Sequence, residues 1–112
     1  MSRTPKLYLE DIIKSIENIN KYVSGLDLES FGKDQKTVDA VVRNIEIVGE
    51  AAKNLSEEYQ EQYPKIPWSQ IMATRNKVVH EYFGVDLEIL WETIKEDLPA
   101  LKKQVEEIAE DF

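Results

Sequence analysis

One short segment carries the residue types best suited to chemistry, with Arg75 followed five positions later by His80, the only histidine in the chain, and then by Tyr82. An imidazole titrates near neutral pH and can act as a base or an acid toward a hydroxyl group. An arginine presents a planar charged fork that binds phosphate and stabilises charge developing on it. The pair therefore predicts chemistry on a phosphodiester, such as RNA cleavage that begins with deprotonation of a 2′-hydroxyl.

The charge around this segment differs from that of the chain as a whole. Residues 63–80 contain no Asp or Glu but hold three cations, Lys65, Arg75 and Lys77. The full chain of 112 residues has 22 acidic and 14 basic residues, a net charge of −8. Because nucleic acid is held mainly by Lys and Arg, we expect any nucleic-acid site to be local and confined to this acid-free stretch.

The spacing of the motif limits how it can work. Successive residues of an α-helix are about 100° apart, so Arg75 and Tyr82 would share a face while Arg75 and His80 would differ by roughly 140°. Two alternatives remain: the helix ends or bulges before His80, which Gly84 favours, or the site combines two chains. A symmetric dimer would also supply two histidines, one for each proton transfer.

The apolar residues recur with helical periodicity, which predicts an all-α bundle of four to five helices without strands. Trp68 and Trp91 fall on apolar faces and are expected in the core. Pro99 should kink or restart the last helix. We expect a connector at 26–33 and helices at 7–23, 34–55, from 56, from 67 to about 84, and from 86 to the C-terminus.

The second predicted helix carries a polar stripe that includes Arg43, Glu46 and Glu50, with Gly49 between the two acids. Glycine inside a helix costs about 1 kcal/mol relative to alanine. One interpretation is a solvated face with a glycine that packs against another helix. The other is a close interface that needs a small residue, with Glu46 or Glu50 facing a cation.

Composition excludes several function classes. The chain has no cysteine, so disulfides, thiolate zinc sites and cysteine nucleophiles are excluded. It has no glycine-rich phosphate loop, no cluster of metal-ligand residues, no apolar run near the roughly 20 residues that span a membrane, and no signal-peptide pattern at its start. We expect a cytoplasmic protein without cofactor or membrane partner.

The segment Arg75-x4-His80-x-Tyr82 resembles the R-x(4–6)-H-x-Tyr signature of the HEPN superfamily, and is most similar to its HepT branch, toxins paired with a minimal nucleotidyltransferase. The resemblance covers nearly the whole chain. Similar segments are Asp34 to Leu55, Ile66-Pro67-Trp68 before the motif, and Trp91 to Pro99.

This resemblance implies a single HEPN/HepT-like domain over residues 1–112, a homodimer, and a metal-independent endoribonuclease with its cleft across the dimer interface. It assigns catalysis to Arg75 and His80 and a supporting role to Asn76; we add Lys77 as a helper. It implies that a cognate nucleotidyltransferase antitoxin attaches AMP to Tyr82, which would block RNA, as in a type VII-like toxin–antitoxin pair.

Two other interpretations remain open. The chain could be a non-catalytic HEPN module that binds a nucleotidyltransferase partner or a nucleotide, or a purely structural helical dimer. His80 would act as the base, or as the acid from the second chain, only in the nuclease. Growth arrest on expression, relieved by His80→Ala, would separate the nuclease from both alternatives.

Overall fold

The structure is a computed structural model that describes residues 4–80 and 84–110. These residues form helices α1 (Pro5–Val23), α2 (Leu28–Lys33), α3 (Gln35–Lys53), α4 (Glu57–Glu61), α5 (Trp68–Val78), α6 (Leu87–Glu92) and α7 (Leu98–Ala109), a π-helix η1 (Thr93–Asp97), and strands β1 (Val79–His80) and β2 (Gly84–Val85). The predicted all-α class is confirmed. Within the described residues, however, the helices outnumber the four to five expected, and the short strand pair was not predicted.

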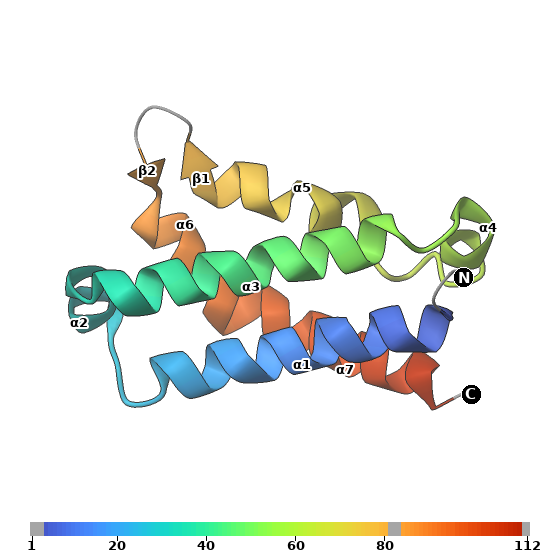
Figure 1. Ribbon diagram of the computed structural model, residues 1–112, viewed down its shortest axis with the longest axis horizontal. Coiled ribbons are helices and arrows are strands. Elements are labelled where there is room, and N and C mark those ends of the chain that lie inside the picture. Colours follow the sequence, from blue (N-terminus) through green and yellow to red (C-terminus); the bar gives the residue numbers. More distant parts are fainter. Residues whose placement is uncertain (1–3, 81–83, 111–112) are drawn as a thin grey trace.

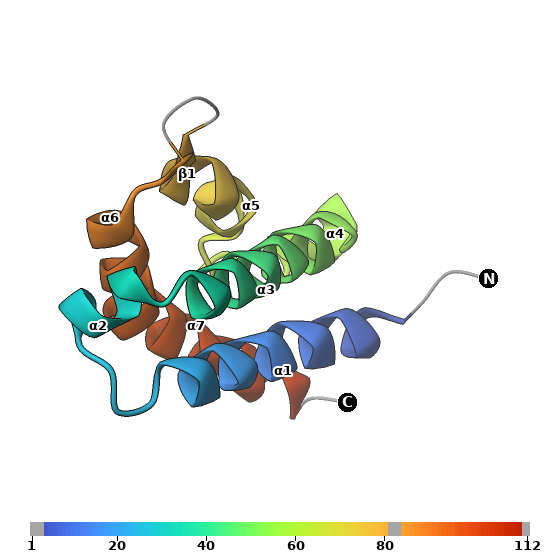
Figure 2. The same cartoon turned by 60° about the vertical axis from the view of Figure 1, so that its left-hand side comes forward.

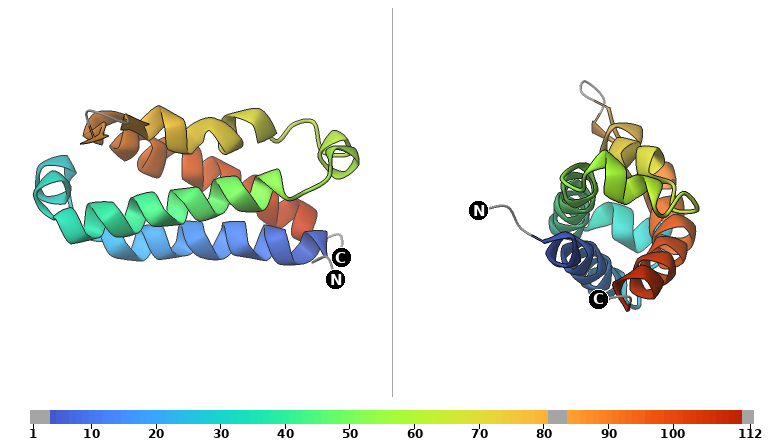
Figure 3. Two further views of the ribbon diagram at one scale, coloured as in Figure 1. Left: turned by 45° about the horizontal axis from the view of Figure 1, so that its top comes forward. Right: turned by 90° about the vertical axis from the view of Figure 1, so that its right-hand side faces the viewer.

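Helix α3 lies at the centre of the arrangement. It runs antiparallel to α1 and packs against α1 on one side and α5 on the other, while α7 packs against α1 (Figure 1). In the turned view, α5 and β1 lie on the side of α3 away from α1 (Figure 2). Seen end-on, α1, α3, α5 and α7 surround a common centre, with α2 and α4 at opposite ends of α3 (Figure 3).

Helices α1 and α3 pack extensively against each other, and most of their buried residues are periodic apolar ones. Pro5 opens α1 at a position where its missing N–H costs nothing, and Gly25, with φ of +79°, follows its end. Leu7, in the first turn of α1, is 40% exposed. The buried apolar residues of the two helices are Leu9, Ile12, Ile16, Ile19, Val23, Val38, Val41, Ile45, Val48, Ala51 and Ala52.

A buried asparagine adds a polar tie between the same helices. Asn44, on α3, donates to the Ala40 carbonyl oxygen at 2.8 Å and accepts from Asn18 Nδ2, on α1, at 3.4 Å. The Asn44 side chain is therefore satisfied although the residue is only 7% exposed. Such a bond fixes the register of two otherwise apolar surfaces.

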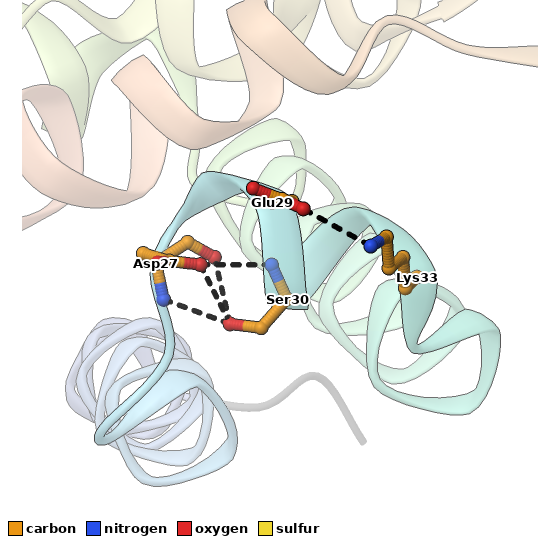
Figure 4. Close-up of polar contacts among 4 residues, drawn as sticks. All are labelled: Asp27, Glu29, Ser30 and Lys33. Atoms are coloured by element: carbon orange, nitrogen blue, oxygen red, sulfur yellow. Dashed lines mark hydrogen bonds and ion pairs between the residues drawn. The ribbon is translucent and has the colours of Figure 1, made fainter.

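The expected connector at 26–33 is wrong in its second half, which forms helix α2. Asp27 and Ser30 make a reciprocal capping box at its start, and Lys33 pairs with Glu29 at 3.0 Å (Figure 4). The helix also buries Phe31 completely. A short segment with both a cap and an apolar anchor can remain helical despite Gly32.

The aspartates that cap α2 and α3 are held in their charged forms. The Ser30 backbone N–H and hydroxyl donate to Asp27, which lowers the pKa of that carboxyl below its ordinary value. The Thr37 hydroxyl donates to Asp34 at 2.7 Å and its backbone N–H at 3.2 Å, and these bonds lower the pKa of Asp34. Both effects favour folding at neutral pH, since the unfolded carboxyls lack these donors.

Pro99 restarts the last helix, as expected, but it also changes the turn before it. Proline has no N–H to donate, and its ring clashes with the carbonyl four residues earlier in a regular helix. The chain accommodates this through the wide turn η1, where the Leu98 N–H donates to the Thr93 carbonyl oxygen.

Among residues 4–80 and 84–110, none of the helices combines the length and the apolar character needed to span a bilayer.

Candidate active site

Helix α5 is fixed at its start by Trp68. The indole N–H of Trp68 donates to the carbonyl oxygens of Gln60 and Tyr63, each at 3.1 Å, and the side chain is 7% exposed. Its predicted place in the core is confirmed. Trp91 is only half-buried, with its ring centroid 5.1 Å from that of Phe31. The first turn of α5 is therefore tied to the end of α4, and the direction of the motif helix is set there.

The helix ends within the motif. α5 stops at Val78, and Val79 and His80 form β1, which pairs antiparallel with β2: Val79 opposite Val85 and His80 opposite Gly84. The Val78 carbonyl accepts from the Asp86 N–H at 2.7 Å, an arrangement that a continuing helix would not allow. The expectation that this helix reaches about Gly84 is wrong, and the alternative that it ends before His80 is confirmed.

This ending changes the geometry of the motif. The backbone of Arg75 lies in α5 and that of His80 in β1, so the roughly 140° separation on one ideal helix no longer applies. The side-chain positions of Arg75 and His80 are outside what the structure describes, and Tyr82 lies outside the described residues. Their predicted roles stay predictions.

The two predicted helpers lie on different sides of α5. Asn76 lines a cavity of about 280 Å³ with Met72 and the polar stripe of α3. Lys77 lines a larger cavity of about 550 Å³, between α5 and the η1–α7 segment. Adjacent helical residues point about 100° apart, so one short ligand on either side would meet only one of them. The structure does not bring Asn76 and Lys77 together.

The polar stripe of α3 forms the wall opposite Asn76. Arg43 Nη1 lies 3.7 Å from Glu46 Oε2, an exposed ion pair of small energetic value. A Cβ added to Gly49 would lie 3.6 Å from the carbonyl oxygen of Ile71, an ordinary contact distance. Gly49 therefore faces α5, as a helix-packing glycine should, beside a solvated face that also holds an acid–cation pair.

Sequence reasoning missed the other wall of the larger cavity. Glu96 and Asp97 of η1 line it together with Lys65 and Lys77. Pro99 signals a break in the helix, but no local pattern shows that a π turn would place these two acids opposite α5. Within the described residues, no group of three or more His, Asp or Glu residues is placed to hold a metal ion.

The fold and motif define an all-α bundle in which an Arg-x4-His pair spans the end of a helix. The family described as Ribonuclease HepT-like matches residues 12–108, and the chain belongs to this family. It is 47% identical over 106 residues to a putative RNase of Caldanaerobacter subterraneus subsp. tengcongensis, covering 95% of each chain. It is 44% identical over 108 residues to a probable ribonuclease HepT of Thermococcus cleftensis, covering 96% of this chain and 98% of the relative.

A third relative carries a similar sequence within a longer protein. The chain is 41% identical over 112 residues to a gamma-glutamylcyclotransferase and putative RNase of Methanocaldococcus jannaschii, of which it covers 50%. No solved structure matches the chain significantly.

Proposed function

We propose that this protein is a metal-independent endoribonuclease toxin in which Arg75 and His80 carry catalysis. Arg75 binds the scissile phosphate and stabilises its transition-state charge, and His80 moves a proton to or from a reacting oxygen. The observation that carries the proposal is the end of α5 at Val78, between the two residues, in a chain of the HepT-like ribonuclease family. A helix end there removes the main geometric objection to a joint site.

Cleavage of a defined RNA in EDTA tests this proposal directly. Wild type, His80→Ala and Arg75→Ala should be purified without any partner and shown to have the same helical content by circular dichroism. Cleavage by wild type and its loss in both variants is the expected result. Equal activity in all three would assign the cleavage to a contaminant and overturn the catalytic roles.

We propose further that the active form is a homodimer whose two motifs meet in one cleft. Each chain has a single histidine, whereas cleavage by general acid and base uses two proton-transfer groups. A second copy would supply the other one. If so, specific activity should fall when the protein is diluted below the dissociation constant of the dimer, which sedimentation velocity measures. A concentration-independent specific activity through that range would contradict the shared cleft.

Tyr82 is the proposed site of control. AMP added to its hydroxyl by a cognate nucleotidyltransferase antitoxin would bring phosphate charge and bulk close to His80 in the sequence and so oppose RNA binding. Intact-mass analysis of protein produced with the partner should show added AMP units, absent from Tyr82→Phe. Cleavage by the modified wild-type protein at the unmodified rate would refute this control. The cytoplasmic location stays a prediction.

The non-catalytic module remains the second candidate, favoured by the strongly acidic charge of the chain, −8 overall. Such a surface opposes general RNA binding. Absence of cleavage by wild type, after mass analysis has shown Tyr82 to be unmodified, would favour this role, in which the protein binds a nucleotidyltransferase or a nucleotide without turning RNA over.

A further inference from the structure

The cavity lined by Lys77, which we name the Lys77 cavity, lies between α5 and the η1–α7 segment. Helix α5 packs against α3 and α6 but makes only sparse contact with η1 and α7. The space left between them is about 550 Å³, within the range of small-molecule sites. Its buried floor includes Ile71, Leu98 and Leu101. An apolar floor of this kind suits the flat face of a ring.

The rim of the Lys77 cavity carries charges of both signs. Lys65 and Lys77 line it together with Glu96 and Asp97. Among the described residues, these four side chains make no ion pair or hydrogen bond, although they line the same space. By contrast, the neighbouring Lys95 lies over the Trp91 ring, 4.7 Å from its centroid. The four rim charges are thus available to a ligand.

A balanced rim excludes one kind of ligand and favours another. Two carboxylates would repel a plain polyanion, so the cavity is not simply a channel for phosphate. A ligand must offer an anionic group to the lysines and N–H donors to a carboxylate. A nucleotide has both, because its phosphate is anionic and its base edge can carry donors.

Among the bases, guanine fits a carboxylate best. Its N1–H and N2–H lie side by side and match the two oxygens of one carboxylate, whereas adenine, cytosine and uracil each offer a single donor group at the corresponding edge. Gln70 and Gln104, which also line the cavity, can pair with the remaining groups of the base edge. The carboxylates stand on the π turn, a feature that often occurs at functional sites.

We infer that the Lys77 cavity binds a guanosine monophosphate unit, with Glu96 or Asp97 on the base and Lys65 and Lys77 on the phosphate. Lys77 lies two residues after Arg75 and three before His80. If the protein is the proposed nuclease, on which this part of the inference rests, the bound guanosine monophosphate unit belongs to the RNA substrate. The cavity then sets a preference for guanine near the cleaved bond.

Binding of free nucleotides tests the site without any cleavage. Titrations of wild type with GMP, AMP, CMP and UMP, followed by calorimetry and by amide chemical shifts, should give GMP the highest affinity, on the order of 10- to 100-fold above AMP. Glu96→Gln with Asp97→Asn should abolish that preference. Glu92→Gln, an exposed acid that does not line the cavity, should keep it.

The phosphate half of the site has its own test. Lys65→Ala should weaken GMP binding but leave the affinity for guanosine unchanged, while Lys103→Ala, exposed and outside the cavity, should alter neither. Equal affinities for GMP and AMP in wild type, or equal losses in the cavity and control variants, would overturn the inference.

Cleavage assays then show whether the guanine that the cavity binds belongs to the RNA substrate or to a free nucleotide. Two RNAs that differ by one guanine should be cut at different rates by wild type and at equal rates by the double variant Glu96→Gln with Asp97→Asn. A GMP preference without any guanine preference in cleavage would overturn the RNA subsite and leave a site for free GMP. A GMP preference in a protein that cuts no RNA would refute the nuclease proposal alone.

Discussion

Gly84→Ala is the sharpest test of the idea that the β1–β2 pair holds His80 outside the helix. Gly84 lies opposite His80 in that pair and has φ of +76°. A side chain in the left-handed region costs roughly 1–2 kcal/mol. The added Cβ would meet no atom within 4 Å, so this cost comes from the backbone alone and not from a steric clash.

That cost is large compared with the free energy that two strands of two residues each gain by pairing. A change of 1–2 kcal/mol shifts an equilibrium by about 5- to 30-fold. If only the paired backbone is competent for cleavage, the rate should fall by up to this factor. The fold as a whole should remain, because most of the buried core that the structure describes lies in the helices and none of the residues described as fully buried belongs to the pair.

Gly25→Ala provides a matched control. Gly25 has φ of +79°, and a Cβ there would also meet nothing within 4 Å, but it follows α1, far from the motif in the sequence. It should lower the free energy of unfolding by a similar amount and leave cleavage unchanged. Gly84→Asn should recover part of the lost activity, because asparagine adopts positive φ more readily than alanine.

The assay combines urea unfolding with RNA cleavage in EDTA for all three variants and wild type. A Gly84→Ala protein that cleaves at the wild-type rate would refute the argument that this pairing positions the site. Equal losses of activity in Gly84→Ala and Gly25→Ala would assign the effect to general destabilisation.

Three further changes test how the motif helix and its neighbours are held. Trp68→Phe leaves the carbonyls of Gln60 and Tyr63 without their indole donor and should cost about 1–2 kcal/mol in urea unfolding; an unchanged midpoint would refute the tie. Asp86→Ala removes the side chain that caps α6 at 3.1 Å and should cost roughly 1 kcal/mol, while Asp86→Asn, also a good cap, should cost less; equal losses would argue against capping. The pKa of Asp34 is lowered in the folded state, so its contribution to stability is full above its ordinary value of 3.8 and is lost as the pH falls through the lower folded value. The Asp34→Asn variant should therefore lose less unfolding free energy than wild type on acidification. An identical pH profile for the two proteins would contradict this.

The long helices could be predicted because their signal is local and repeated. The apolar pattern of residues 7–23 has helical spacing, and Gly25 follows its end. The predicted helix 34–55 ends two residues beyond Lys53, the last residue of the observed α3. Periodicity works here because each helix buries one face against a neighbour, so the pattern in the sequence and the pattern of burial share a cause.

The short elements were not predicted because their stability does not come from a periodic apolar face. Helix α2 has six residues, too few for a repeating pattern, and depends on its capping box and on buried Phe31. The π turn η1 depends on a proline that lies beyond its end. A periodic count of apolar residues detects none of these three causes: the capping box, the burial of Phe31 or the proline.

For the candidate site, the sequence suggests residue types, whose roles stay predictions, but it does not suggest the surroundings that the structure describes. The spacing of Arg75 and His80 left two alternatives, a helix that ends before His80 or a site combined from two chains, and α5 does end before His80. The position of the break at Val78 depends on the hydrogen bond from the Asp86 N–H. This bond joins the end of α5 to the start of α6, and no sequence pattern between them predicts it. Gly84 indicated an early end without locating it.

Helix α5 presents different chemistry on its two sides, and this bears on how the proposed nuclease could both hold and select its RNA. On one side, Asn76 faces a smaller cavity lined by the polar residues of α3. On the other, Lys77 faces a larger one with two acids opposite. Since neighbouring residues of one rigid helix line both, a strand bound in the Lys77 cavity would be placed relative to Arg75 by the helix itself. Selection on one side and catalysis at the end of the helix would then be coupled through the short stretch of backbone from Arg75 to Lys77, in a helix whose first turn is held by Trp68.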